Sequence, residues 1–139
     1  MAVLSKWLDI ESEGENDVVD LTGDVQRVLT EAGMTGGLVT VYVPGSTGAI
    51  TTLEYEPGLV KDFCRALGRI APENERYEHQ EAWHDDNGRS HVKAALVGPS
   101  LTVPFVGSKL VLGDWQQIVF AEFDVRPRRR RIVVQVVGD

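Results

Sequence analysis

The sequence is poor in cysteine, histidine and positive charge. Its one cysteine, Cys64, cannot form an internal disulfide, and there is no cysteine cluster that would indicate an iron–sulfur or zinc site. The 14 Lys and Arg residues are outnumbered by 21 Asp and Glu residues, giving a formal net charge of -7. Because phosphate backbones bind basic surfaces, this balance argues against a nucleic-acid partner.

Long apolar runs are also missing. No segment approaches the ~20 apolar residues of a membrane-spanning helix, so we expect a cytoplasmic protein with no membrane partner. The 139 residues, 42% of them hydrophobic, suffice for a single domain over 1–139 with its own core. Cys64 falls within an apolar helical pattern, which favours packing over a reactive thiol.

Two segments have the residue spacing of amphipathic helices. Residues 21–33 offer Thr22 as an N-cap and Gly33 at the C-terminal end, where a residue tolerant of positive φ is preferred. Residues 57–70 begin with Pro57, which suits a first helical position, and repeat apolar residues at helical intervals. Two main helices are therefore predicted.

Runs of β-branched residues, separated by glycine, proline or charge, predict the strands. The expected strands are 3–10, 36–45, 48–56, 91–98, 100–106, 109–124 and 130–138, with a hairpin turn at 106–109. Helices that come early and strands that come in a late run indicate an α+β fold rather than a doubly wound sheet.

The one basic run, 126–131, leads into the apolar C-terminal strand. A charged turn or strand edge that discourages aggregation is the simplest interpretation. Anion binding and pairing at a subunit interface are alternatives, and RNA binding is disfavoured by the net charge.

All three histidines lie between residues 77 and 91. His79, His84 and His91 are five and seven residues apart, and neither interval places two imidazoles on one helix face for zinc. A shared site would therefore form where a loop enters a strand. In a strand that begins at His91, Lys93 shares its face at the polar end. Solvated or structural histidines are the alternative to a functional site.

Two further segments carry polar side chains suited to a ligand. The turn with Ser46 and Thr47 offers backbone N–H groups and hydroxyls to an anion, but it also fits a tight turn and lacks the lysine of a phosphate-binding loop. Glu54, placed in a strand, faces either solvent or a ligand. Trp115 suits a core or subunit interface, and Gln116, if buried, would suit an orienting role.

Five motifs follow one another along the chain: ITTLEYEPGLVKD, YEH, SHVKAALVGPSLTVPF, LGDWQQIVFAEFD and RRRRIVVQVVG. Over nearly its whole length the chain thereby resembles the YjbQ-type family, which carries the name secondary thiamine-phosphate synthase. The resemblance implies an α+β fold with a β-sandwich-like core of mostly antiparallel strands and two main helices. It also implies assembly as a homotrimer.

The resemblance and the reaction it names imply a site. The candidate catalytic residues are Glu54, His79, His91 and Lys93. The candidate substrate-binding residues are Ser46, Thr47, Trp115 and Gln116. The candidate metal ligands are His79, His91 and Glu54, with His84 as a further candidate. The implied cofactor is a divalent metal ion, Mg²⁺ or Zn²⁺, and the implied partner is a small phosphorylated metabolite.

The implied reaction joins a hydroxymethylpyrimidine diphosphate to a thiazole phosphate and releases pyrophosphate. A non-enzymatic trimer that binds a metal or a small phosphorylated metabolite is one alternative, and a metal-assisted phosphoester hydrolase is another. The chain departs from the family pattern at Gly45, where many relatives have histidine, and at Leu53 and Tyr55, which replace two asparagines. His84 is a candidate substitute for the imidazole missing at position 45.

Overall fold

The computed structural model describes residues 1–139 and contains eight strands and four helices. In chain order the elements are β1 (Ala2–Ser12), β2 (Val18–Asp20), α1 (Thr22–Ala32), β3 (Gly36–Tyr42), β4 (Gly48–Leu53), α2 (Pro57–Ile70), α3 (Glu78–Trp83), α4 (Gly88–Val97), β5 (Ser100–Val106), β6 (Lys109–Leu110), β7 (Gln117–Glu122) and β8 (Arg128–Gly138).

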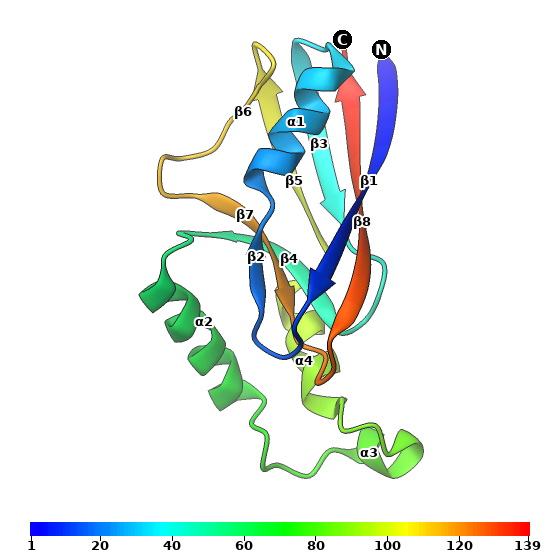
Figure 1. Ribbon diagram of the computed structural model, residues 1–139, viewed down its shortest axis with the longest axis vertical. Coiled ribbons are helices and arrows are strands. Elements are labelled where there is room, and N and C mark those ends of the chain that lie inside the picture. The colour runs from blue at the N-terminus through cyan, green and yellow to red at the C-terminus, as the bar shows by residue number, and fades with distance from the viewer.

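The strands form two antiparallel sheets. The larger has the order β1-β8-β3-β5-β6 and the smaller the order β2-β7-β4. β1 and β8, from opposite ends of the chain, pair over their whole lengths, from Ala2 opposite Gly138 to Ser12 opposite Arg128. Figure 1 shows α1 over the upper part of the molecule and the other three helices around its lower half. The expected α+β class with antiparallel sheets is confirmed, with two more helices than expected.

The main core lies where α1 meets the sheets. β8 buries its even-numbered residues from 130 to 138 and leaves the odd-numbered ones exposed or half-buried, as the alternation of side chains along a strand requires. The apolar face of α1 contributes Val25, Val28 and Leu29, as its spacing predicts. The largest fully buried side chains are Phe105, Phe120 and Phe123.

Local signals placed most of the turns correctly. Gly33 ends α1 with φ of 68°, and the 106–109 hairpin turn has positive φ at both Gly107 and Ser108. The expected Thr22 cap was wrong, because Leu21 is the N-cap residue. The Thr22 hydroxyl instead accepts a hydrogen bond from the Ile118 N–H at 2.9 Å, which ties α1 to β7.

The segment 91–98, expected as a strand, is part of helix α4. The buried residues of α4, at positions 88, 89, 90, 93 and 94, recur at helical rather than strand intervals. Alanine and leucine are strong helix formers, and they follow Lys93 directly in the sequence. The preceding histidine region likewise contains a short helix, α3, where a loop was expected.

The arginine run does not form a strand edge, because β8 lies between β1 and β3. Its four arginines from 128 to 131 each have a carboxylate partner. Arg129 and Arg131 pair with Glu11 and Asp9 across the β1–β8 ladder. Arg128 pairs with Asp124, and the buried Arg130 pairs with the buried Glu122. The positive charge of residues 128–131 is therefore matched within the chain.

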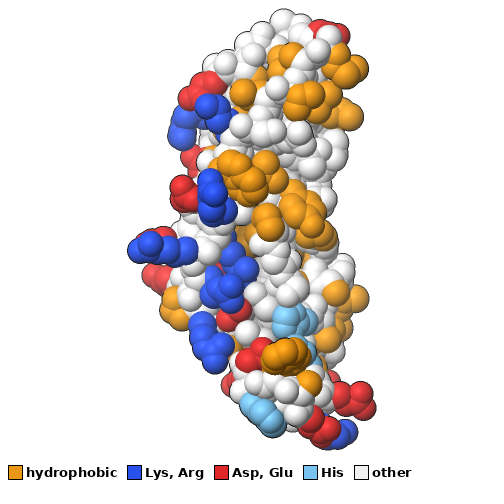
Figure 2. Space-filling model, turned by 90° about the vertical axis from the view of Figure 1, so that its right-hand side faces the viewer, with side chains coloured by type: hydrophobic (Ala, Val, Ile, Leu, Met, Phe, Trp, Pro, Cys, Tyr) orange, Lys and Arg blue, Asp and Glu red, His pale blue; other side chains and the backbone are white.

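One face of the larger sheet has no helix over it. Trp7, Leu38, Tyr42 and Val106, from β1, β3 and β5, each expose between 42% and 70% of their surface. Figure 2 shows hydrophobic side chains grouped on the side of the molecule where β1 and β8 lie. We call these four residues the apolar sheet face.

The longest helix, α2, has 14 residues, and no helix has both the length and the apolar character needed to cross a membrane.

Candidate metal centre

His79, Asp85 and His91 come together at the lower end of the molecule. His79 lies on α3, Asp85 on the turn that follows, and His91 on α4. One ligand atom of each lies within 4.8 Å of the other two. The two imidazole rings meet edge to face with centroids 4.5 Å apart. Figure 2 shows histidine side chains reaching the surface there.

The turn between α3 and α4 is built by residues in unusual backbone conformations. His84 ends α3 with φ of 54°, and Asp86 has φ of 60°. The Gln80 side chain accepts from the Asp86 N–H at 2.6 Å. The Asp85 carboxylate accepts from the Asn87 N–H at 3.1 Å. These bonds turn the chain back, so that α4 returns beside α3 and the two histidines face each other.

The orientation of His91 is set by the main chain. Its Nδ1 lies 3.0 Å from the carbonyl oxygen of Ser46, in the loop before β4. A carbonyl only accepts, so Nδ1 carries the proton and donates, and Nε2 keeps a free lone pair. Ligating histidines in metal sites are commonly oriented by such a bond from the other ring nitrogen.

Asp85 is held in its charged form. The backbone N–H of Asn87 is the main cause that lowers the pKa of this carboxyl, and the His79 side chain adds to the effect against partial burial. Nε2 of His79 lies 3.3 Å from the nearer Asp85 oxygen. The centre therefore combines a carboxylate with two imidazoles, all three only partly buried.

This donor set fits a zinc-type ion. Ligands bonded at ~2.0–2.1 Å in a tetrahedron lie about 3.3 Å apart, which is the separation of His79 and Asp85. Two imidazoles and one carboxylate suit Zn²⁺ and similar transition metals, whereas Mg²⁺ prefers oxygen ligands. Of the two expected ions, the residues therefore fit Zn²⁺. Asp85 was missed in the sequence because its contribution depends on the turn at His84.

Two expected ligands lie elsewhere. His84 is exposed and outside the three-residue cluster. Glu54 is exposed and follows the end of β4 at Leu53, so the expected strand position was wrong. Gly48, at the other end of β4, lines the pocket that His91 lines, and Leu53 is about 16 Å further along the strand. Within one chain, Glu54 is not brought to the histidines.

Lys93 faces away from His91. Residues two positions apart on a helix are separated by about 200° around its axis. The face that His91 and Lys93 were expected to share therefore required the strand that does not form. The Lys93 side chain is buried, with Nζ 3.5 Å from Glu15. Arg89, one turn earlier, donates to both oxygens of Glu15 at 2.7 and 2.9 Å. These contacts position α4, and through it His91, against the turn after β1.

The loop before β4 does not present a free anion-binding turn. Ser46 is exposed and supplies its carbonyl to His91. Thr47 is buried, where its hydroxyl donates to Asp124 at 3.1 Å and accepts from Arg130 at 2.8 Å. Gly45 has φ of 139°, and a Cβ there would lie 3.0 Å from Nη1 of Arg130. The guanidinium thus lies against position 45, where the resemblance implied an imidazole.

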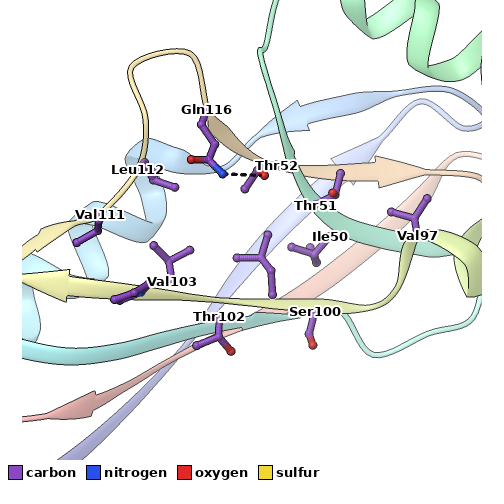
Figure 3. Close-up of a pocket in the computed structure, with 12 residues that line it drawn as sticks. Ile50, Thr51, Thr52, Val97, Ser100, Thr102, Val103, Val111, Leu112 and Gln116 are labelled. Atoms are coloured by element: carbon purple, nitrogen blue, oxygen red, sulfur yellow. Dashed lines mark hydrogen bonds between the residues drawn. The ribbon is translucent and has the colours of Figure 1, made fainter.

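Gln116 lies at a separate cleft, and its chain neighbour Trp115 does not line that cleft. Trp115 is 76% exposed, so a core position is ruled out within one chain. Gln116, also exposed, donates to the Thr52 hydroxyl at 3.2 Å across a cleft of about 330 Å³ between β4 and β5. Figure 3 shows this bond at one side of the cleft, above apolar side chains such as Val103. No histidine lines it.

The family model described as "UPF0047 protein YjbQ-like" matches residues 6–139. The chain belongs to this family. A UPF0047 protein from Archaeoglobus fulgidus is 36% identical over 130 residues, which cover 94% of this chain and 98% of that protein. The family expected from the motifs is confirmed.

Solved structures show the same fold in relatives. A hypothetical protein from Aeropyrum pernix is 31% identical, with a TM-score of 0.90, covering 98% of this chain and 99% of that one. A protein of unknown function from Sulfolobus solfataricus is 28% identical, with a TM-score of 0.89, covering 99% and 100%. The YjbQ-like fold therefore extends over essentially the whole chain.

The expected reaction is not supported by these relatives. The matched UPF0047 proteins and solved structures carry family names or are described as hypothetical, uncharacterized or of unknown function, and none is named a thiamine-phosphate synthase. The expected reaction, the coupling of a pyrimidine to a thiazole, was therefore wrong, because the relatives support the family alone. Its residue set was also too wide for one site, because Glu54 and Gln116 lie away from the histidines in this chain.

Proposed function

We propose that this UPF0047 protein binds a divalent transition-metal ion, with Zn²⁺ as the best fit, through His79, Asp85 and His91. The observation that carries the proposal is the convergence of the three donors within 4.8 Å, with the ring of His91 fixed by Ser46. Three protein ligands leave a tetrahedral ion with one open position. Such an open position takes water or an oxygen atom of a ligand.

The ligand that we propose for the open position is a small phosphorylated metabolite. A pocket of about 380 Å³ adjoins His91 and is lined by the loop before β4, by α4 and by the residue that precedes β5. Its other lining residues are Gly45, Ser46, Gly48, Ala94, Ala95 and Pro99. Its size lies at the lower end of the range for small-molecule sites. Phosphate oxygens are suitable donors for the remaining position of the ion.

Metal binding is tested by titrating metal-free protein with Zn²⁺ in a calorimeter. We expect one ion per chain and a loss of affinity of more than about 100-fold in His79→Ala, His91→Ala and Asp85→Asn. His84→Ala is the matched control, since it removes a neighbouring imidazole that lies outside the cluster, and it should bind as the unmodified chain does. Equal affinity in the control and the three ligand variants would refute the proposed centre.

The ligand is tested separately with inorganic phosphate and a sugar phosphate as probes. Zinc-loaded protein should show changes in the resonances of Gly45, Ser46 and His91 on addition of either probe. Metal-free protein should show smaller changes at the same residues. Identical changes in both forms would rule out a ligand bound through the ion while leaving the metal centre itself intact.

We also propose that the chain assembles as a homotrimer through the apolar sheet face. Its four residues leave large apolar side chains in water on a surface without a covering helix. Exposed apolar patches of this kind are typical of subunit interfaces. Sedimentation equilibrium should give three times the chain mass of 15.3 kDa. Leu38→Lys should shift the mass toward the monomer, and Val92→Lys, another exposed apolar position but on α4, should leave it unchanged.

The cytoplasm is the compartment that we propose for this site. The single thiol, Cys64, is half-buried and free, which suits a reducing environment. Cell fractionation with an antibody to the chain tests this location, and recovery from the culture medium or the membrane fraction would contradict it.

A further inference from the structure

A groove beside α2 gathers positive charge in a chain whose net charge is -7. Its volume is about 620 Å³, and three of its lining residues, Lys61, Arg65 and Arg69, recur at every fourth position of the helix. Asn16 and Cys64 also line it, and no acidic side chain does. We call this feature the basic groove. It shares no residue with the metal centre.

The cations of the basic groove are poorly matched by carboxylates. Lys61 and Arg69 have no ion-pair partner within 4.0 Å, and Arg65 has only the exposed Asp62, at 3.2 Å. The arginines at 128–131 differ, because each has a carboxylate partner. Surface cations without partners are available to an external anion, whereas paired ones must first give up a contact.

Beside Asn16, which lines the groove, Glu15 belongs to an ion-pair cluster with two buried cations. Glu15 is the shared carboxylate partner of Arg89 and Lys93, and the exposed Asp86 also pairs with Arg89. Burial raises the pKa of the Cys64 thiol, and the Lys93 ammonium opposes that rise, which places its positive field at the groove wall. A buried charge is screened less by water than a surface charge.

The acidic residues on either side of Asn16 are already engaged. Glu15 accepts from Arg89 and Lys93, and Asp17 accepts from the backbone N–H of Glu13 at 2.9 Å. Neither lines the groove. These two negative charges are thus directed to internal partners, and Asp62 is the one carboxylate that pairs with the row of cations on α2.

We propose that the basic groove binds a small anion carrying two or more negative charges. Residues four apart on a helix are separated by about 6 Å along its axis, so the three cations form a row about 12 Å long. A singly charged ion would reach one of them, whereas a di- or trianion spans two or three. The groove volume falls within the range of small-molecule sites.

Binding is tested on metal-free protein with citrate and pyrophosphate as probes and with chloride as the singly charged reference. Amide resonances of residues 60–69 and of Asn16 should shift with either probe and not with chloride at equal concentration. The affinity should fall as ionic strength is raised, because the contacts are surface ion pairs. Shifts confined to the loop before β4, or to residues 126–131, would overturn the proposal.

A second test of the proposal reverses the charge of two residues of the basic groove. Lys61→Glu with Arg69→Glu should weaken citrate binding by about tenfold or more. Arg27→Glu reverses an exposed arginine on α1 and is the control expected to change affinity little. Circular dichroism checks that each variant is folded. His91→Ala should bind citrate as the unmodified chain does. Loss of binding in that variant would place the anion at the metal centre and overturn the groove assignment.

Discussion

The imidazole of His91 and the carbonyl oxygen of Ser46 are joined by a hydrogen bond of 3.0 Å, which links α4 to the loop before β4. The bond connects segments 45 residues apart in the chain. It directs one nitrogen of the ring into the protein and leaves the other free to act as a ligand. The proposed metal centre thus depends on a contact between α4 and the main chain of the loop before β4.

The tautomer of His91 follows from this bond. In metal-free protein at pH 8, we expect the proton on Nδ1 and a bare Nε2, because only a protonated nitrogen can donate to the Ser46 carbonyl. Nitrogen-15 NMR of the imidazole reports the tautomer directly. Addition of Zn²⁺ should shift the Nε2 resonance and leave Nδ1 protonated. A proton found on Nε2 would contradict the proposed ligand atom.

Gly45 should tolerate no side chain without loss of stability. Its φ of 139° is unfavourable for other residues, and a Cβ would lie 3.0 Å from the buried Arg130 guanidinium. Gly45→Ala should lower the free energy of unfolding by about 1–3 kcal/mol, measured by urea denaturation. Gly23→Ala is the matched control, because it lies in α1 with open space around it. That variant should be neutral or slightly stabilising.

The buried Glu122–Arg130 pair should be costly to break from one side. Nε of Arg130 donates to Glu122 at 2.9 Å, and both side chains are almost wholly buried. Arg130→Met leaves a buried carboxylate without its cation and should reduce the free energy of unfolding by about 3–5 kcal/mol. The double variant with Glu122→Gln should recover part of this loss. A double variant no more stable than Arg130→Met would show that the ion pair is not the cause.

Acid should destabilise the chain partly through Glu15. The hydrogen bond from Arg89 is the main cause that lowers the pKa of this carboxyl. Its contribution to stability is therefore complete above the unfolded-state pKa, about 4.3, and is lost as pH falls through the lower folded-state value. Glu15→Gln should unfold more readily than the unmodified chain at pH 7, and the difference between them should shrink toward pH 3.

Glu54→Gln is the control for this measurement. Glu54 is exposed and forms no ion pair, so its replacement should leave the free energy of unfolding at pH 7 unchanged. A difference between Glu15→Gln and the unmodified chain that stays constant from pH 7 to pH 3 would exclude the linkage to the Glu15 proton.

Most of the strands could be predicted from the sequence because one side of each is buried. β8 is the clearest case, because buried residues alternate with exposed or half-buried residues along its sequence. The limits of α2 follow from Pro57 and from the apolar spacing that ends near Ile70. In these elements, local preference and tertiary burial agree.

The segment 88–97 shows where local signals were insufficient. A run such as Val92 to Val97 suits either a buried strand or a helix when its length and partners are unknown. The helix places Arg89 and Lys93 one turn apart, where both reach Glu15. A strand would also have put them on one face, but farther apart. The helix thus brings two cations to a carboxylate that precedes Arg89 by 74 positions in the chain.

The sequence by itself determined the family, the α+β class, most strand positions and the prominence of His79 and His91, because these depend on residue order and local periodicity. The tertiary structure alone decided that Asp85 lies beside His79 and His91, that His84 and Glu54 lie outside this cluster, and that Gly45 lies against Arg130. Those outcomes depend on left-handed turns and contacts between distant segments. No pattern within a short stretch of chain records such contacts.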